Sequence, residues 1–246
     1  MVQSMRSILS AIHWLVWRNP RRRAQNLLRF AEVEADGGRD LVRAAEVTSD
    51  PRLRRLFLKH ALDEQRHADL FRTRGLALIR SLPRETASGV QAAWLTPGER
   101  GLDDLQVERE GDEALLAFLH LSEKQAARDF ANYVGVLGAD PSTQSVLEKV
   151  LHDETFHMTY TRRELERIAP ERADKRIWGA RLNRFWKAYL RLASALAGLL
   201  GGIMLTLQYY LLLPPFALLA RRAARKEPGG WSPVAPERNG PLKGQY

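Results

Sequence analysis

One motif, a carboxylate followed by an imidazole, occurs twice in this chain and constrains its fold more than any other feature. The stretch Asp63-Glu64-Gln65-Arg66-His67 is echoed by Asp153-Glu154-Thr155-Phe156-His157. In both copies the Glu and the His stand three residues apart, so on an α-helix the two side chains share one face. Each copy can therefore direct both groups at one point inside a helical bundle.

The similarity between the two copies extends upstream of the motif. Glu34 precedes the first copy and Glu123 precedes the second at almost the same spacing. Asp50-Pro51 and Asp140-Pro141 stand equally far ahead of their motifs, and each predicts a turn with Pro at the first position of the next helix. The sequence therefore predicts the same helix pair twice, and each pair contains a Glu followed by Glu-x-x-His.

The spacing of apolar residues predicts an all-α fold with four long helices. They are expected over residues 24–48, 51–80, 112–137 and 141–168. The segment 81–111 contains several glycines and prolines, and we expect a long crossover with one short helix. Such a crossover lets the two helix pairs pack antiparallel around a common core.

Six side chains on the inner helix faces form a ligand set for metal ions. The predicted metal ligands are Glu34, Glu64, His67, Glu123, Glu154 and His157. Four carboxylates and two imidazoles are hard, oxygen-rich ligands that suit two divalent iron ions or a manganese–iron pair. The chain has no cysteine, which excludes disulfides, rubredoxin-type iron and iron–sulfur relays. Electrons for oxygen reduction would therefore come from a separate donor protein or from the substrate.

A Glu from each of two helices plus Glu-x-x-His from each of the other two is the signature of ferritin-like di-iron and di-manganese bundles. Over residues 25–168 the chain resembles this superfamily, which includes rubrerythrins and di-iron oxygenases. The resemblance implies a ferritin-like four-helix bundle with two Fe ions bridged or chelated by Glu64 and Glu154. Glu34 and Glu123 would then be terminal ligands, and each metal ion would take one imidazole.

The resemblance also gives a role to the aspartate directly before each motif glutamate. In di-iron oxygenases this aspartate holds the histidine of the opposite motif, which would pair Asp63 with His157 and Asp153 with His67. The alternative is that both aspartates lie on a solvated helix edge.

Two further histidines lie one helical turn before a predicted ligand, on the same face. His60 precedes Glu64, and His120 precedes Glu123. Both are candidates for hydrogen-bond partners of the ligands or for a proton path. The alternative is that both are ordinary core histidines whose ring nitrogens are satisfied locally.

The first copy of the motif resembles a narrower group within the superfamily. Asp-Glu-Gln-Arg-His is similar to the [DE]-E-x-R-H signature of bacterial multicomponent monooxygenases and acyl-carrier-protein desaturases, whereas rubrerythrins usually lack the Arg. The second copy has Phe156 in place of Arg66. The oxygenase resemblance therefore holds for one copy of the two.

A pair of glycines lies inside the first predicted helix, close to Glu34. Gly37 and Gly38 should each cost about 1 kcal/mol of helix stability relative to Ala. Ala126 and Ala127 stand at the same offsets from Glu123. The small residues either leave room beside the metal ions or allow close packing of two helices.

The C-terminal part of the chain contains a candidate membrane segment. From Leu192 to Ala220 there are 29 residues without a charge, and a basic run begins at Arg221. About 20 apolar residues span a bilayer, so the segment is long enough to cross, and we expect Pro214-Pro215 to end its helix. The alternatives are a re-entrant hairpin that bends at Gly201-Gly202 and a buried helix of a soluble protein.

These features predict four segments: an amphipathic N-terminal segment, the metal-binding bundle, a transmembrane or membrane-hairpin segment and a disordered tail. Their expected bounds are 1–23, 24–170, 171–226 and 227–246. The first is either a helix in the membrane interface or a helix that caps the bundle. The net charge of +9 and the pI of about 10.1 fit an anionic membrane better than nucleic acid, because no basic motif is interleaved with aromatic residues. We therefore expect a membrane-associated protein with its bundle on the cytoplasmic side of the inner (plasma) membrane.

The leading functional prediction is a membrane-anchored di-iron enzyme that activates O2. Its substrate would be a small apolar molecule of the lipid, quinone or isoprenoid class, because an anchor raises the local concentration of such molecules, and an external protein would supply electrons. One alternative is iron handling, as a ferroxidase or an iron sensor. Another is peroxide reduction in the manner of rubrerythrins.

Overall fold

The described part of the chain is almost entirely α-helical. The computed structural model describes residues 17–87, 90 and 107–226. Its helices are α2 (Pro20–Val47), α3 (Pro51–Ser81), α4 (Arg84–Ala87), α5 (Val107–Val136), α6 (Pro141–Ile168) and α7 (Ala173–Ala224). No strand occurs among these residues, which confirms the all-α prediction. Most of the predicted N-terminal segment and crossover, and the whole predicted tail, lie outside the described residues.

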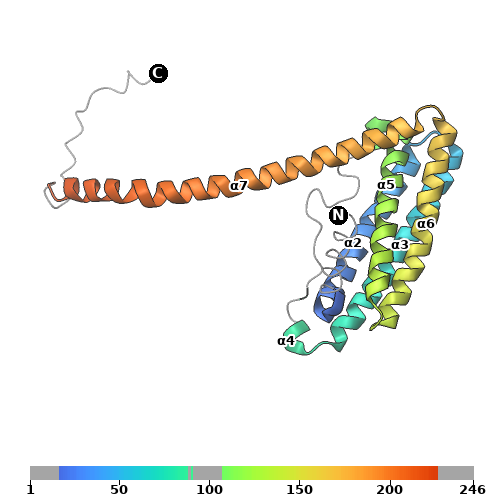
Figure 1. Cartoon of the computed structure of the whole chain (residues 1–246), viewed down its shortest axis with the longest axis horizontal. Coiled ribbons are helices and arrows are strands. Elements are labelled where there is room, and N and C mark those ends of the chain that lie inside the picture. The colour runs from blue at the N-terminus through green and yellow to red at the C-terminus, as the bar shows by residue number, and fades with distance from the viewer. Residues whose placement is uncertain (1–16, 88–89, 91–106, 227–246) are drawn as a thin grey trace, which may run out of the picture. The chain divides into compact units, whose positions relative to one another are not determined.

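Four of these helices form a helical bundle. α2 packs along α3 and α5 packs along α6, and the two pairs meet through contacts of α3 with α6 and of α2 with α5. Figure 1 shows the four helices lying side by side. Most of the packing therefore lies within each pair, as expected for a helix pair that occurs twice in the sequence.

Three of the bundle helices begin at an Asn-Pro or Asp-Pro pair. The side chain of Asn19 accepts hydrogen bonds from the backbone of Arg21 and Arg22 at the start of α2. Asp50 caps α3 in the same way, and Asp140 caps α6. Because each cap satisfies backbone N–H groups that have no partner within the helix, the helix starts are fixed by sequence. The two predicted Asp-Pro turns are confirmed.

The buried apolar side chains form two clusters, one toward each end of the bundle. One cluster contains the C-terminal half of α2 with the N-terminal halves of α3 and α5, and extends to Ala173 and Ile177 of α7. The other contains the N-terminal half of α2 with the C-terminal halves of α3 and α5 and the start of α6. All six predicted metal ligands fall between the two clusters along their helices. The bundle therefore has a polar layer between two apolar ones.

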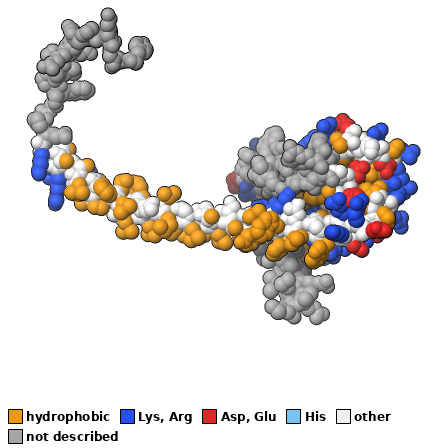
Figure 2. Space-filling view, turned by 90° about the horizontal axis from the view of Figure 1, so that it is seen from above, with side chains coloured by type: hydrophobic (Ala, Val, Ile, Leu, Met, Phe, Trp, Pro, Cys, Tyr) orange, Lys and Arg blue, Asp and Glu red, His pale blue; other side chains and the backbone are white. Residues whose placement is uncertain are grey.

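The described chain divides into two compact units, and the division falls within the long helix α7. The division falls between Phe185 and Trp186, so the first turns of α7 are part of the bundle unit. In the second unit α7 is long and apolar enough to span a membrane. Figure 2 shows hydrophobic side chains along this part of α7 and basic ones near its C-terminal end.

The prediction that Pro214-Pro215 ends this helix is wrong. α7 continues through both prolines to Ala224, and it passes Gly201-Gly202 without a bend into a hairpin. Each proline removes one backbone donor and strains the preceding turn, at a cost of about 3 kcal/mol. The residues on both sides keep helical geometry, so the two adjacent prolines interrupt the hydrogen-bond ladder without ending the helix.

Candidate metal centre

All six predicted ligands meet in the polar layer of the bundle, together with His60. The ligand atoms form two groups, within each of which the atoms lie no more than 4.8 Å apart. The groups are His60, Glu64, Glu123 and His157, and Glu34, Glu64, His67 and Glu154. Glu64 belongs to both groups, whereas Glu154 belongs to one. Two adjacent metal positions that share the carboxylate of Glu64 would account for this arrangement.

The predicted ligands are supplied by four different helices and are all shielded from solvent. α2 contributes Glu34, and α5 contributes Glu123, each 8% exposed. α3 and α6 each contribute a Glu-x-x-His pair, and both imidazoles are fully buried. An i, i+3 spacing on one helix face explains why each pair points into the bundle interior.

The motif aspartates hold the two buried histidines across the bundle. Nε2–H of His67 donates to Asp153 over 3.1 Å, and Nε2–H of His157 donates to Asp63 over 3.3 Å. These are the crossed pairs that the resemblance to di-iron oxygenases implied. Since Nε2 carries the proton in each ring, Nδ1 carries the free lone pair.

Several inward-facing atoms have no hydrogen-bond partner among the residues that the structure describes. They are Nδ1 of His67, Nδ1 of His157 and Oε2 of Glu154. Nδ1 of His67 lies 3.5 Å from the nearer carboxylate oxygen of Glu154, and Nδ1 of His157 lies 3.6 Å from that of Glu64. These distances are too long for good hydrogen bonds. They suit two ligand atoms that each lie about 2.1 Å from one ion.

A single arginine neutralises both motif aspartates. Nη2 of Arg66 donates to Asp63 over 2.8 Å and to Asp153 over 2.9 Å. The second copy of the motif therefore has a guanidinium partner although Phe156 stands in place of its arginine. Phe156 is 45% exposed, and the ammonium of Lys59 lies 4.8 Å from its ring centre.

His60 belongs to one of the two ligand groups, whereas the sequence indicated only a neighbour of the ligands. Its Nε2 lies 2.8 Å from Oε1 of Glu64 and 3.7 Å from Oε1 of Glu123. Its Nδ1 lies 2.7 Å from the hydroxyl of Tyr160. The spacing of His60 and Glu64 places both on one helix face, but the partner hydroxyl comes from α6 and has no signature in the local sequence.

His120, the other histidine that precedes a ligand, lies in a different environment. Its Nδ1–H donates to the carbonyl of Met158 over 3.0 Å, and it belongs to neither ligand group. The ring lines a separate cavity at the edge of the bundle. The sequence spacing of His60 and His120 is similar, so their different surroundings arise from packing.

Burial strongly disfavours negative charge on the central carboxylates. Burial, and then the neighbouring carboxylates, raise the pKa of Glu34 and of Glu154 well above the ordinary value. Burial raises the pKa of Glu64 to about 8. Without a cation the folded protein therefore keeps protons on these groups at neutral pH, and bound metal ions would replace those protons.

One of the two glycines beside Glu34 lies at a close helix contact. A Cβ atom on Gly38 would lie 3.3 Å from the carbonyl oxygen of Ala61 and 3.4 Å from Cβ of Glu64. A Cβ atom on Gly37 would contact nothing within 4 Å. Gly38 therefore allows α2 to approach α3 at the level of the ligands, and Gly37 has no such role.

The donor set fits metal ions on three grounds: its chemistry, its burial and its unpartnered atoms. The buried His/Glu cluster could therefore hold a metal ion. Comparisons with protein-family models, with curated proteins and with solved structures find no match for this chain.

Proposed function

We propose that this protein is a membrane-anchored, ferritin-like di-metal oxidoreductase, with two iron ions or a manganese–iron pair. The observation that carries the proposal concerns the buried ligand set. Within the described part of the chain, Nδ1 of both motif histidines has no partner, while an aspartate holds the opposite nitrogen. When bound, such a pair of ions supplies the redox chemistry by which O2 is reduced and a substrate is oxidised.

The protein's own groups would position and neutralise this centre. Asp63 and Asp153 fix the orientation of the imidazoles, and Arg66 donates a hydrogen bond to each aspartate. The two apolar clusters flank the polar layer and would keep bulk water from it. Since a hydroxyl can donate or accept a hydrogen bond, Tyr160 can serve His60 in either tautomer, which gives a proton a place at Nδ1 of His60.

The substrate class is inferred from the apolar part of α7. A helix that could span a membrane would keep the bundle near the bilayer, where lipid-, quinone- and isoprenoid-like molecules concentrate. The chain has no cysteine, so electrons would come from a separate protein or from the substrate itself, as they would from a quinol. We place the bundle on the cytoplasmic side, where a soluble reductase could reach it.

The proposal is tested with the full chain in a neutral detergent. The protein is loaded anaerobically with Fe(II), desalted and assayed for iron per chain, and O2 uptake is then followed with a short-chain quinol present. We expect about two irons per chain and oxidised quinol in proportion to O2 consumed. His67→Ala with His157→Ala should lose iron and O2 uptake, whereas His152→Ala, which changes an exposed histidine on α6, should lose neither.

Other results would favour the alternatives or end the proposal. Many equivalents of Fe(II) oxidised without any organic product would indicate iron handling. Faster consumption of hydrogen peroxide than of O2 with an added electron donor would indicate a peroxide reductase. No retained metal would mean that the ligand pattern is not a metal centre.

A further inference from the structure

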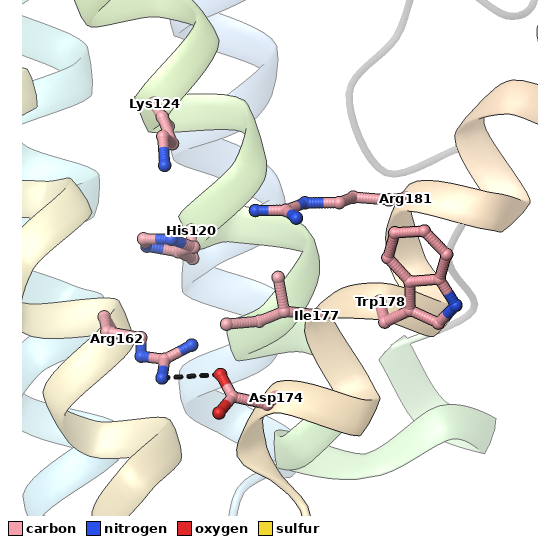
Figure 3. A pocket seen from close by; sticks show the side chains of 7 residues that line it. All are labelled: His120, Lys124, Arg162, Asp174, Ile177, Trp178 and Arg181. Carbon is pink, nitrogen blue, oxygen red and sulfur yellow. Dashed lines mark hydrogen bonds and ion pairs between the residues drawn. The ribbon is translucent and has the colours of Figure 1, made fainter.

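A cavity outside the metal centre gathers basic side chains from three helices. It has a volume of about 500 Å³ and lies within the bundle unit, between α5, α6 and the first turns of α7. Figure 3 shows His120 and Lys124 of α5, Arg162 of α6 and Arg181 of α7 around it. Positive charge from distant parts of the sequence is therefore concentrated in one place.

Most of this charge lacks a counter-charge. The single carboxylate among the residues that line the cavity is that of Asp174, which accepts a hydrogen bond from Arg162 over 2.8 Å. Arg162 also pairs with Glu166 over 2.6 Å. Lys124 and Arg181 form no ion pair within the described part of the chain. Two cationic groups therefore face the cavity without an acidic partner among the described residues.

His120 provides a buried polar group at the same place. It is 8% exposed, and because its Nδ1–H donates to Met158, its Nε2 carries the lone pair and can accept a hydrogen bond from a ligand hydroxyl, such as that of a singly protonated phosphate. The pKa of His120 is lowered from its ordinary value, first by burial and further by the charges of Lys124 and Arg181. A positive field therefore reaches this ring, which an anion in the cavity would offset.

We propose that this cavity binds the phosphate group of a phosphate-bearing ligand. Lys124 and Arg181 would donate to the phosphate oxygens, and a guanidinium can do so through two parallel hydrogen bonds. Ile177 and Trp178 line the same cavity and offer an apolar surface to the rest of the ligand. The phosphate can come from a phospholipid head group or from a soluble phosphate.

The test measures binding of two phosphorus probes to the full chain in neutral detergent micelles. Inorganic phosphate and dioctanoyl phosphatidic acid are titrated separately and followed by phosphorus NMR at fixed ionic strength. The test variant is Lys124→Gln with Arg181→Gln. The matched control is Arg55→Gln with Arg163→Gln, which removes the same charge from exposed positions outside the cavity.

We expect saturable binding that the test variant weakens roughly tenfold or more, because charge-assisted hydrogen bonds are lost. The control should change the affinity less than about twofold, since exposed charges are screened by salt. Tighter binding of the lipid than of inorganic phosphate identifies a head-group site, and equal binding identifies a site for soluble phosphate. Arg181→Gln alone, which is far in sequence from any metal ligand, should already weaken binding.

Two results would overturn the proposal. One is the absence of saturable binding of either probe to the unaltered chain. The other is an equal loss of affinity in the test and control variants, which would mean that the probes respond to overall charge and not to this cavity. Neither result depends on the metal content of the protein, so the outcome is independent of the proposed oxidoreductase function.

Discussion

The two halves of the bundle supply matching candidate metal ligands but surround them with different side chains. Four residues before the motif glutamate the first half has His60 and the second half has Val150. Three residues after the motif histidine the first half has Leu70 and the second half has Tyr160. His60 and Tyr160 form a hydrogen bond of 2.7 Å, whereas Val150 and Leu70 belong to an apolar cluster.

This difference makes the two ligand groups chemically unequal. The group that contains His60 offers two imidazoles and two carboxylates, and the other offers one imidazole and three carboxylates. An ion in the second group would therefore meet more negative charge. The repeated sequence specifies where ligands lie, and the departures from the repeat specify how the two positions differ.

The largest expected effect is a difference in metal content between variants of Glu64, which both ligand groups share, and variants of Glu154, its counterpart in the other half. Glu64→Ala removes a ligand from both groups, so we expect loss of both ions. Glu154→Ala removes a ligand from one group, so we expect about one ion per chain to remain. Iron per chain after anaerobic loading and desalting measures this, with circular dichroism to confirm the helical fold. Equal iron content in the two variants would contradict the shared role of Glu64.

The second comparison concerns the residue that differs between the two motif copies. Arg66→Met leaves Asp63 and Asp153 without their guanidinium, and changes in groups that orient ligands cost roughly 10–100-fold in metal affinity. Phe156→Met alters a half-exposed ring and should change affinity little. Competition titrations with a metal chelator measure both constants. If the two variants lost affinity equally, one arginine would not serve both halves.

A third experiment makes the two halves alike around the ligands. In the double variant His60→Val with Tyr160→Leu, each residue is replaced by the type found at the matching position of the other half. We expect one of two metal-binding steps to weaken roughly tenfold or more, because one ligand of that group is lost. The step that belongs to the group with Glu34 should be unchanged. Two equally weakened steps would show that His60 acts on both positions.

The metal-free protein should respond to pH through carboxylates from both halves. The pKa of Glu64 is raised to about 8 and those of Glu34 and Glu154 are raised too, so the folded protein holds protons that the unfolded chain releases. The unfolding free energy should therefore fall as pH rises from about 6.5 to about 8, by about 1.4 kcal/mol per pH unit for each such proton.

The histidines restrict the pH range in which this effect can be read. The pKa values of His60 and His157 are lowered by burial, which reduces stability as pH falls below about 6.5, the ordinary histidine value. Urea unfolding of the chelator-treated protein, followed by circular dichroism, measures the slope above that pH. The metal-loaded protein is the control, and its stability should not fall over this range. A flat curve for the metal-free protein would contradict the raised carboxyl pKa values.

The smallest expected effect tests the small residues beside the ligands. Gly37→Ala and Gly38→Ala each make the first half resemble the second, which has Ala126 and Ala127. Gly37→Ala has open space and should raise the unfolding free energy by about 1 kcal/mol. Gly38→Ala meets α3 and should be about 1–2 kcal/mol less stable than Gly37→Ala. Urea unfolding of both variants measures the difference, and equal stabilities would rule out close packing at Gly38.

The parts of the fold that the sequence predicted depend on local periodicity. A Glu and a His three residues apart must share a helix face, and an Asp-Pro pair caps the helix that follows it, so helix starts and inward faces could be read directly. Which face of one helix packs against which face of another could not be read from the sequence, because it depends on the rotation of each helix in the packed bundle. Arg66 and Asp153 are 87 residues apart, and His60 and Tyr160 are 100 residues apart. No local spacing relates residues at such separations.

The helix α7 shows a different limit of sequence reasoning. Pro214-Pro215 is a strong local signal for the end of a helix, yet α7 continues to Ala224. Helical hydrogen bonds on both sides outweigh the donors that the prolines lack. A local rule gives the free-energy cost of a proline inside a helix. The hydrogen bonds of the surrounding residues determine whether the helix continues despite that cost.

The division of the bundle into two helix pairs has a mechanical consequence. Because α2 packs mainly on α3 and α5 mainly on α6, each pair is a hairpin with its own interface. Metal ions held by Glu34 and Glu64 on one side and by Glu123 and Glu154 on the other would tie the hairpins together, much as a disulfide joins two segments. The centre would then be a structural cross-link as well as a reactive site, and the amount of bound metal would determine how far the two hairpins can separate.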